Sequence, residues 1–183
     1  MRIIAGRAKG SQIFTPKSRD TRPTQDRVRE SLFNILQGDV PGATVLDLFA
    51  GSGALALESI SRGADKAVTV DHSHDADACI RRNAAKLGFA DQIEVLKCDW
   101  RASVSVLQRR KMQFDLVFLD PPYNMTETPE ICECLEAAGL LFGEALIVIE
   151  HGKGCEPVMN SPFIKQDMRT YGDTEISFFT YRP

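Results

Sequence analysis

The tetrapeptide Asp120-Pro121-Pro122-Tyr123 contains the residue types best suited to chemistry. An amino group on a nucleobase is a poor nucleophile because its lone pair is delocalised into the ring. Two acceptors aimed at its N–H groups favour a pyramidal nitrogen and concentrate that lone pair. The Asp120 carboxylate and the Pro121 carbonyl oxygen can be these acceptors, since proline fixes φ and removes a competing N–H donor. Tyr123 can stack on the base.

All four residues of this tetrapeptide are therefore expected to be catalytic and to hold an amino nitrogen while a methyl group is transferred to it. Two prolines after a buried strand can also be a simple strand terminator. That interpretation explains the prolines, but it explains neither the acidic residue nor the aromatic one. The same arrangement serves the amino groups of adenine, cytosine and guanine, so the residues alone leave the base open.

A glycine-rich turn from Asp47 to Gly53 follows an apolar segment and indicates a cofactor site. Glycines let the backbone turn tightly and let a ligand approach without meeting a Cβ atom, and the next helix offers free N–H groups. Asp71 and Asp99 end the next two predicted strands, where they can bind a ribose and an adenine amino group. The expected cofactor-binding residues are Asp47, Phe49, Gly51, Gly53, Asp71 and Asp99.

The same turn has a competing interpretation as a dinucleotide site, because Gly51, Gly53 and Ala56 fit the pattern Gly-x-Gly-x-x-Ala. Asp47 discriminates between the two interpretations. A carboxylate near the helix end is unfavourable for an anionic pyrophosphate, whereas it suits the cationic amino group and the sulfonium of S-adenosylmethionine. The expected cofactor is therefore S-adenosylmethionine.

Short apolar segments alternate with helical patterns, and these elements must position both sets of residues. Strands are predicted at 45–48, 67–70, 93–96, 114–119 and 145–149. Helices are predicted from 24 to about 38, from the glycine turn to about 62, and over 73–87, 101–110 and 127–138. Residues 162–170 and 174–181 are predicted to form a terminal β-hairpin.

Continuous apolar strands that alternate with helices are typical of a parallel sheet with helices on both faces. The predicted fold class is α/β, with a doubly wound and mostly parallel sheet. Ligands bind beyond the carboxyl ends of such strands, so the glycine turn and the tetrapeptide are expected on one rim. Asn83 lies on the apolar face of its predicted helix, and we expect it to be buried and to tie down a neighbouring loop.

The charge of the chain is unevenly distributed. The net charge is −3, but residues 1–30 contain eight basic and three acidic side chains, a net +5, and the remainder is −8. Basic segments bind phosphate backbones by releasing counterions, although a solvated N-terminus is an equally simple explanation. Turn signals predict a short hairpin in residues 1–23, an appendage on one domain that spans 1–183. The expected RNA-binding residues are Arg7, Lys9, Arg19 and Arg22.

Length and composition exclude several classes of protein. With 183 residues, 43% of them hydrophobic and 26% charged, the chain has the composition of a globular domain rather than of a disordered or fibrous protein. No apolar run approaches the ~20 residues that cross a bilayer, and no signal peptide is visible. The cysteines contain no Cys-x-x-Cys pair, so no metal is expected, and the cytoplasm is the expected location.

The order of these motifs resembles that of the class I S-adenosylmethionine-dependent amino-methyltransferases. Further segments are similar to the bacterial 16S ribosomal RNA guanine-N2 methyltransferase family. These segments are Met1–Gly6 with Lys9-Gly10, Thr21–Thr24, Asp26–Glu30, Phe33–Leu36, Leu46–Gly53 and Ser61–Ala64. The resemblance covers nearly the whole chain, but after Cys155 it is limited to the turn Tyr171-Gly172-Asp173.

The resemblance implies a seven-stranded class I methyltransferase fold with a small N-terminal hairpin. It implies methylation of one guanine N2 in 16S rRNA, on the small ribosomal subunit or its assembly intermediate. It also implies that Asp47, Gly51 and Gly53 line the cofactor, that Asp71 and Asp99 bind its ribose and adenine, and that the tetrapeptide holds the base. The alternative is an N-methyltransferase of adenine N6, of cytosine N4 or of a protein amide.

Overall fold

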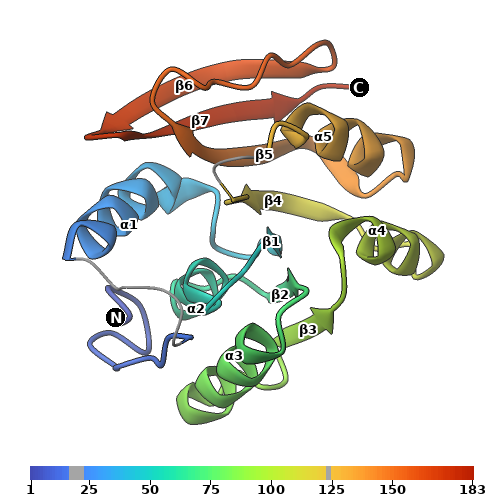
Figure 1. Ribbon diagram of the computed structural model, residues 1–183. Coiled ribbons are helices and arrows are strands. Elements are labelled where there is room, and N and C mark those ends of the chain that lie inside the picture. The colour runs from blue at the N-terminus through green and yellow to red at the C-terminus, as the bar shows by residue number, and fades with distance from the viewer. Residues whose placement is uncertain (17–22, 123–124) are drawn as a thin grey trace.

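Seven strands form one sheet in the order β3-β2-β1-β4-β5-β7-β6 (Figure 1). The computed structural model describes residues 1–16, 23–122 and 125–183, with the backbone alone in 23–25. Strands β1 to β5 run parallel, while β7 and β6 complete one edge in antiparallel pairing. The predicted doubly wound, mostly parallel α/β sheet is therefore confirmed.

The observed elements lie close to the predicted ones. The strands are β1 Thr44–Leu48, β2 Lys66–Asp71, β3 Ile93–Lys97, β4 Phe114–Leu119, β5 Leu141–Gly152, β6 Phe163–Tyr171 and β7 Thr174–Tyr181. The helices are α1 Pro23–Ile35, α2 Ala54–Ser61, α3 His74–Leu87, α4 Trp100–Arg109 and α5 Thr128–Ala137, and a 3-10 turn, Leu36–Gly38, follows α1. In the part of the chain that the structure describes, no helix is both long and apolar enough to span a membrane.

Alternation along the strands divides the interior into two layers, because successive side chains of a strand point to opposite faces. Val45, Leu116 and Val148 belong to the core under helices α1, α2 and α3. Leu46 and Val117 belong to the core under α4 and α5, on the other face (Figure 1). Because both faces are covered, the central strands are apolar on both sides.

Strand β5 is longer than predicted at both ends. Leu141 pairs with Phe114 ahead of a register shift, and Glu144 has a φ of 67°, so an irregular stretch interrupts the apolar pattern there. At the other end, pairing with β7 continues to Gly152, although the side chains are no longer apolar. The predicted C-terminal hairpin is confirmed as β6 and β7, which are joined at Gly172.

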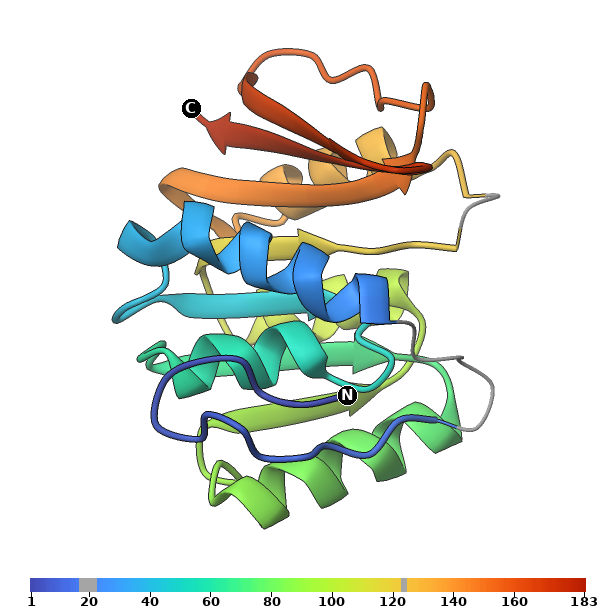
Figure 2. The same cartoon turned by 90° about the vertical axis from the view of Figure 1, so that its left-hand side faces the viewer.

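The N-terminal segment, residues 1–16, lies along helices α2 and α3 (Figure 2). One antiparallel bridge, between Arg2 and Gln12, joins its two arms, so the hairpin is present without a strand-length ladder. Ile3 and Ile13 are buried in the same core as α1 to α3. The described part of the predicted appendage is thus packed on the body of the protein.

The tip of this segment points away from the edge that should bind ligands. The backbone N–H of Arg7 donates to the carbonyl oxygen of Ser61, the last residue of α2, at 2.8 Å. In Figure 2 the tip lies on the left, at the edge where the parallel strands begin, and the chain returns toward the edge where they end. Only the two ends of the segment therefore approach the carboxyl edge of the sheet.

Candidate active site

Four acidic residues follow or end neighbouring strands at the carboxyl edge of the sheet. Asp47 is the fourth of the five residues of β1, and Asp71 ends β2. Asp99 follows β3, and Asp120 follows β4. Because these strands are adjacent and parallel, the structure places the predicted cofactor turn and the start of the predicted catalytic tetrapeptide on one rim.

Asp47 is buried at the N-terminus of α2. Its Oδ2 atom accepts a hydrogen bond from the Ala56 backbone N–H at 3.2 Å, and the residue is 1% exposed. A carboxylate in the first turn of a helix interacts favourably with the helix dipole. In a dinucleotide site, the N-terminus of this helix would attract the pyrophosphate. Here the carboxylate of Asp47 already places a negative charge at the N-terminus of α2.

The glycine turn adopts left-handed backbone conformations at three positions. Phe49, Gly51 and Gly53 have φ values of 65°, 56° and 74°. A Cβ atom at Gly53 would lie 3.0 Å from Cγ1 of Ile80, so glycine at this position allows α3 to pack against the turn. Phe49 adopts this conformation despite its side chain, which is a strained arrangement typical of functional sites.

Asp71 fixes the glycine turn from the neighbouring strand. Its Oδ2 accepts from the Gly51 backbone N–H at 2.9 Å, and its Oδ1 accepts from the Ser73 N–H at 2.9 Å. Two backbone donors orient the carboxylate, while each oxygen has a second lone pair that can accept from a hydroxyl. One strand further, Asp99 is the N-cap residue of α4 and accepts from the Arg101 N–H at 2.9 Å.

A cleft of about 440 Å³ opens beside the glycine turn. Asp47 and Phe49 line it from the turn, and Asp120 lines it from the end of β4. Helix α1 and the turn between β6 and β7 provide further walls. The hydroxyl groups of Ser31 on α1 and Tyr171 on that turn lie 2.7 Å apart, so a hydrogen bond joins these two walls.

Of the described residues of the predicted catalytic tetrapeptide, only Asp120 lines this cleft. Asp120 is a lining residue, whereas the described residues that line the cleft include neither Pro121 nor Pro122. The carbonyl oxygen of Pro122 accepts from the Met125 N–H at 2.8 Å. Tyr123 lies outside the described residues, so its stacking role stays a prediction.

Two of the predicted RNA-binding residues, Arg7 and Lys9, lie away from the cleft. Arg7 lies at the amino edge of the sheet, where its guanidinium is 4.4 Å from the Phe89 ring centroid and hydrogen-bonds to Gln92. Lys9 lies in the same exposed tip. Arg19 and Arg22 lie outside the described residues.

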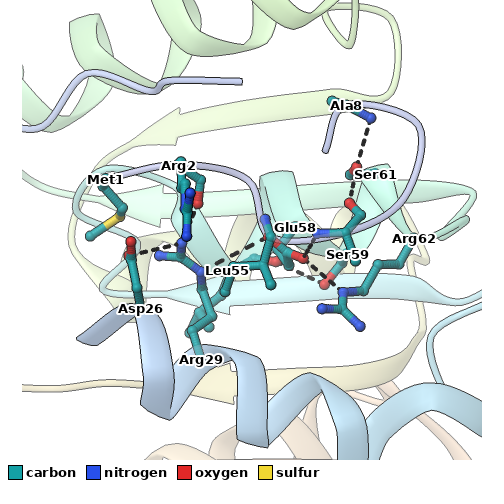
Figure 3. Close-up of polar contacts among 12 residues, drawn as sticks. Met1, Arg2, Ala8, Asp26, Arg29, Leu55, Glu58, Ser59, Ser61 and Arg62 are labelled. Atoms are coloured by element: carbon teal, nitrogen blue, oxygen red, sulfur yellow. Dashed lines mark hydrogen bonds and ion pairs between the residues drawn. The ribbon is translucent and has the colours of Figure 1, made fainter. Parts of the chain in front are cut away.

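A buried carboxylate that the sequence analysis missed fixes the N-terminal segment on α2 (Figure 3). Glu58 has no exposed surface. Its carboxylate accepts from the N–H groups of Ile4 and Ala5 at 2.8 and 3.0 Å, and from Arg62 Nε at 2.7 Å. An acidic residue four positions before an arginine, inside the apolar stretch Ala54–Ile60, is the sequence signal that could have revealed it.

Arg29 extends this ionic cluster to α1 and to the cleft (Figure 3). Its Nε lies 4.0 Å from the Glu58 carboxylate, and its Nη2 donates to Asp26 at 3.2 Å and to the carbonyl oxygen of Arg2. Burial lowers the pKa of the Arg29 guanidinium, while Asp26 and Glu58 oppose that shift. One cluster thus connects α1, α2 and the N-terminal segment beneath the cleft wall.

Asn83 has the role expected from its position on the apolar face of α3. Its side-chain oxygen accepts from the Phe14 N–H at 2.8 Å. Its side-chain nitrogen donates to the carbonyl oxygens of Phe14 and Ser52 at 2.9 and 3.2 Å. This buried amide therefore ties the N-terminal segment and the glycine turn to one helix, and the prediction is confirmed.

The five cysteines are free thiols. Burial raises the pKa of Cys132, on α5, to about 12. Outside the two gaps in the description of the chain, no group of three or more His, Cys, Asp or Glu side chains is arranged to hold a metal ion. The polar contacts described at the rim are those of carboxylates with backbone N–H groups.

Comparison with known proteins agrees with this geometry. The family model described as Conserved hypothetical protein 95 matches residues 1–180. Ribosomal RNA small subunit methyltransferase D of Escherichia coli K12 is 38% identical over 150 residues, which are 82% of this chain and 74% of that protein. YlbH of Bacillus subtilis is 31% identical over 183 residues, the full length of both chains.

A solved structure supports the same assignment. That of yhhF from Escherichia coli has 32% sequence identity and a TM-score of 0.86, covering 100% of this chain and 98% of that one. The similarity includes the N-terminal segment, the glycine turn and the strand that delivers Asp120. The chain therefore belongs to the Conserved hypothetical protein 95 family, the methyltransferase family that includes ribosomal RNA small subunit methyltransferase D.

Proposed function

We propose that this protein transfers a methyl group from S-adenosylmethionine to the exocyclic N2 amino group of a guanine in 16S rRNA of the small ribosomal subunit. The observation that carries the proposal is that Asp120 lines the same cleft as Asp47 and Phe49. An acceptor for an amino group and the turn expected to bind the cofactor thus share one cavity. The names of relatives such as the small subunit methyltransferase of Escherichia coli support the choice of RNA.

The rim residues fit S-adenosylmethionine better than a dinucleotide. When bound, this cofactor supplies an electrophilic methyl group on a positively charged sulfur. Asp47 contributes negative charge beside the turn, where a pyrophosphate would be repelled. Asp71 is held by two backbone N–H groups in an orientation that suits a ribose diol, and Asp99 follows the next strand, on the side expected for the adenine.

Asp120 would accept a hydrogen bond from the target amino group and orient its lone pair. The Pro121 carbonyl oxygen is the proposed second acceptor, and Tyr123 is the proposed stacking partner of the base. Catalysis then depends largely on holding nitrogen, carbon and sulfur in line. Because the nitrogen becomes acidic as it gains positive charge, the site needs no strong base.

A basic surface near the cleft supports an RNA partner. Arg82 and Lys86 of α3 are exposed, and their charged groups lie 3.5 and 5.0 Å from the Phe14 ring centroid. Phe14 is followed by Thr15 and Pro16, which line the cleft. Cationic and aromatic side chains together bind phosphates and stack bases. We therefore assign RNA contacts to this surface, named the α3 basic surface.

Arg7, Lys9, Arg19 and Arg22 remain proposed RNA contacts. Since Arg7 and Lys9 lie at the amino edge, they would contact RNA remote from the target base rather than the nucleotide in the cleft. An extended contact of this kind suits a substrate as large as a ribosomal subunit.

The test uses small ribosomal subunits from cells that lack the modification, together with S-adenosylmethionine that carries a labelled methyl group. We expect the label in 16S rRNA, and none when Asp120→Ala replaces the wild-type chain. Label in ribosomal proteins would instead favour methylation of a protein amide. Calorimetry with S-adenosylmethionine and with NAD checks the cofactor independently, and binding of NAD alone would contradict the assignment.

A further inference from the structure

A second carboxylate lies next to Asp120 in the sheet. Leu119 of β4 and Ile149 of β5 are register partners, so Asp120 and Glu150 are the next residues on two adjacent parallel strands. Neighbouring strands lie about 4.8 Å apart. Both residues line the cleft, and Glu150 is half-buried there. The sheet thus presents two carboxylates side by side to whatever base enters.

Alternation along β5 explains why Glu150 faces the cleft. Val148 belongs to the core under α1 to α3, and Glu150 is two residues later, on the same face of the strand. Pairing of Glu150 with Ile176 of β7 fixes the strand on its other side. The carboxylate is therefore carried by a strand with partners on both edges, which orients it more rigidly than a loop would.

Guanine is the nucleobase whose donors match two adjacent carboxylates. Its N2 amino group lies next to N1–H, so the edge presents donors at both positions. In adenine and cytosine the ring nitrogen next to the amino group carries a lone pair instead, which a carboxylate repels. We propose that Glu150 accepts a hydrogen bond from N1–H of the target base and so selects guanine, while Asp120 binds the N2 amino group.

This inference rests on the proposed function, and it removes an ambiguity of the catalytic tetrapeptide, which serves three kinds of base equally well. A site built to hydrogen-bond a substrate donor rejects analogues that lack it, and a base with a lone pair at this position would place that lone pair against the negative charge of Glu150. Glu150 would therefore determine specificity, whereas Asp120 acts on the reacting nitrogen.

The test replaces the target guanine by 2-aminopurine, which keeps the 2-amino group but has a lone pair at N1. Small subunits are reconstituted with either base at the modified position, and kcat/KM is measured for wild type and for Glu150→Gln. The glutamine amide can donate to that lone pair. We expect the wild type to prefer guanine and Glu150→Gln to lower this preference about 10- to 100-fold, with unchanged cofactor affinity by calorimetry.

Glu144→Gln is the matched control, because Glu144 lies on the same strand but its side chain is 67% exposed and paired with Arg182. It should keep the wild-type preference. An unchanged preference in Glu150→Gln would overturn the inference. So would a wild-type enzyme that methylates 2-aminopurine as well as guanine, a result that needs no variant.

The identity of the wild-type product separates failure of this inference from failure of the proposed function. If the wild type forms N2-methylguanosine and the preference is unaffected by Glu150→Gln, only the role of Glu150 is wrong. If the wild type modifies adenine or cytosine, or transfers nothing, the proposed function is wrong. The role inferred for Glu150 is then wrong as well, because it rests on that function.

Discussion

At the scale of single residues, two carboxylates of the rim fix the backbone around the proposed cofactor site. Asp71 holds the glycine turn through Gly51, and Asp47 caps the helix that follows it. Residue type and spacing were enough to predict that these side chains meet at one edge of the sheet. They did not predict a role for Glu150. The sequence shows only an acidic residue after the apolar part of a strand, and its position beside Asp120 follows from the register of β4 and β5.

Substitutions of Asp120 and Asp71 should affect two different quantities, the rate of methyl transfer and the affinity for the cofactor. Asp120→Ala removes the acceptor for the amino group, and we expect kcat to fall at least about 100-fold while cofactor affinity is retained. Asp71→Ala should weaken cofactor binding at least about tenfold, since it removes the anchor of Gly51 and the proposed charge-assisted hydrogen bonds to the ribose. Calorimetry and single-turnover methyl transfer check both. Normal turnover by Asp120→Ala would disprove its assigned role.

At the scale of elements, the sheet and its helices could be predicted from the sequence. The place where the N-terminal segment docks could not. Strand and helix patterns are local, so the boundaries of β1 to β3 differ from the predicted ones by at most one residue, and those of β4 coincide with them. The docking of residues 1–16 instead depends on Glu58, a carboxylate that is buried only because two backbone N–H groups and two arginines surround it. The sequence around Glu58 indicates its pairing with Arg62 on the same helix, but the contacts with Ile4 and Ala5 join residues more than 50 positions apart and follow only from the fold.

Loss of the Glu58 charge should destabilise the fold. Glu58→Gln leaves the buried Arg29 without its nearest carboxylate on α2, and removal of one partner of a buried pair costs about 3–5 kcal/mol. Urea unfolding measures the difference. Glu144→Gln breaks an exposed pair with Arg182 and should change the free energy of unfolding by at most about 1 kcal/mol. Equal effects of the two substitutions would contradict the structural role of Glu58.

The α3 basic surface should contribute to the salt dependence of RNA binding. Replacing Arg82 and Lys86 by Glu removes two cations near the cleft, so the slope of log K against log salt should become shallower by about one to two. The matched control replaces Arg109 and Lys111, exposed residues at the end of α4 and just after it, on the other face of the sheet. An equal change of the slope in the two variants would contradict the proposal that the α3 basic surface contacts RNA.

At the scale of the whole molecule, the net charge of −3 conceals an uneven distribution that the fold organises. The basic N-terminal segment spans the layer of α2 and α3 from one edge of the sheet to the other (Figure 2), while acidic residues gather at the carboxyl rim. The sequence predicted the charge difference between the two parts. It could not predict that Arg7 would lie at the far edge, since that depends on where the segment docks.

The buried thiol of Cys132 makes stability sensitive to alkaline pH. Its pKa of about 12 in the folded chain exceeds the ordinary value of 9.0, so the unfolded chain loses this proton first. The stabilising contribution is complete below pH 9 and is lost as the pH rises toward 12. Between pH 8.5 and 10.5, wild type should lose about 1–2 kcal/mol more stability than Cys132→Ala. Parallel urea titrations with identical pH profiles would contradict this.

We propose that two carboxylates, Asp120 just after β4 and Glu150 on β5, hold a guanine for methylation at N2. The most direct measurement digests 16S rRNA to nucleosides after methyl transfer to unmodified small subunits and identifies the labelled product by mass. We expect N2-methylguanosine with the wild-type chain and none with Asp120→Ala. A product of N6-methyladenosine or N4-methylcytidine would contradict it.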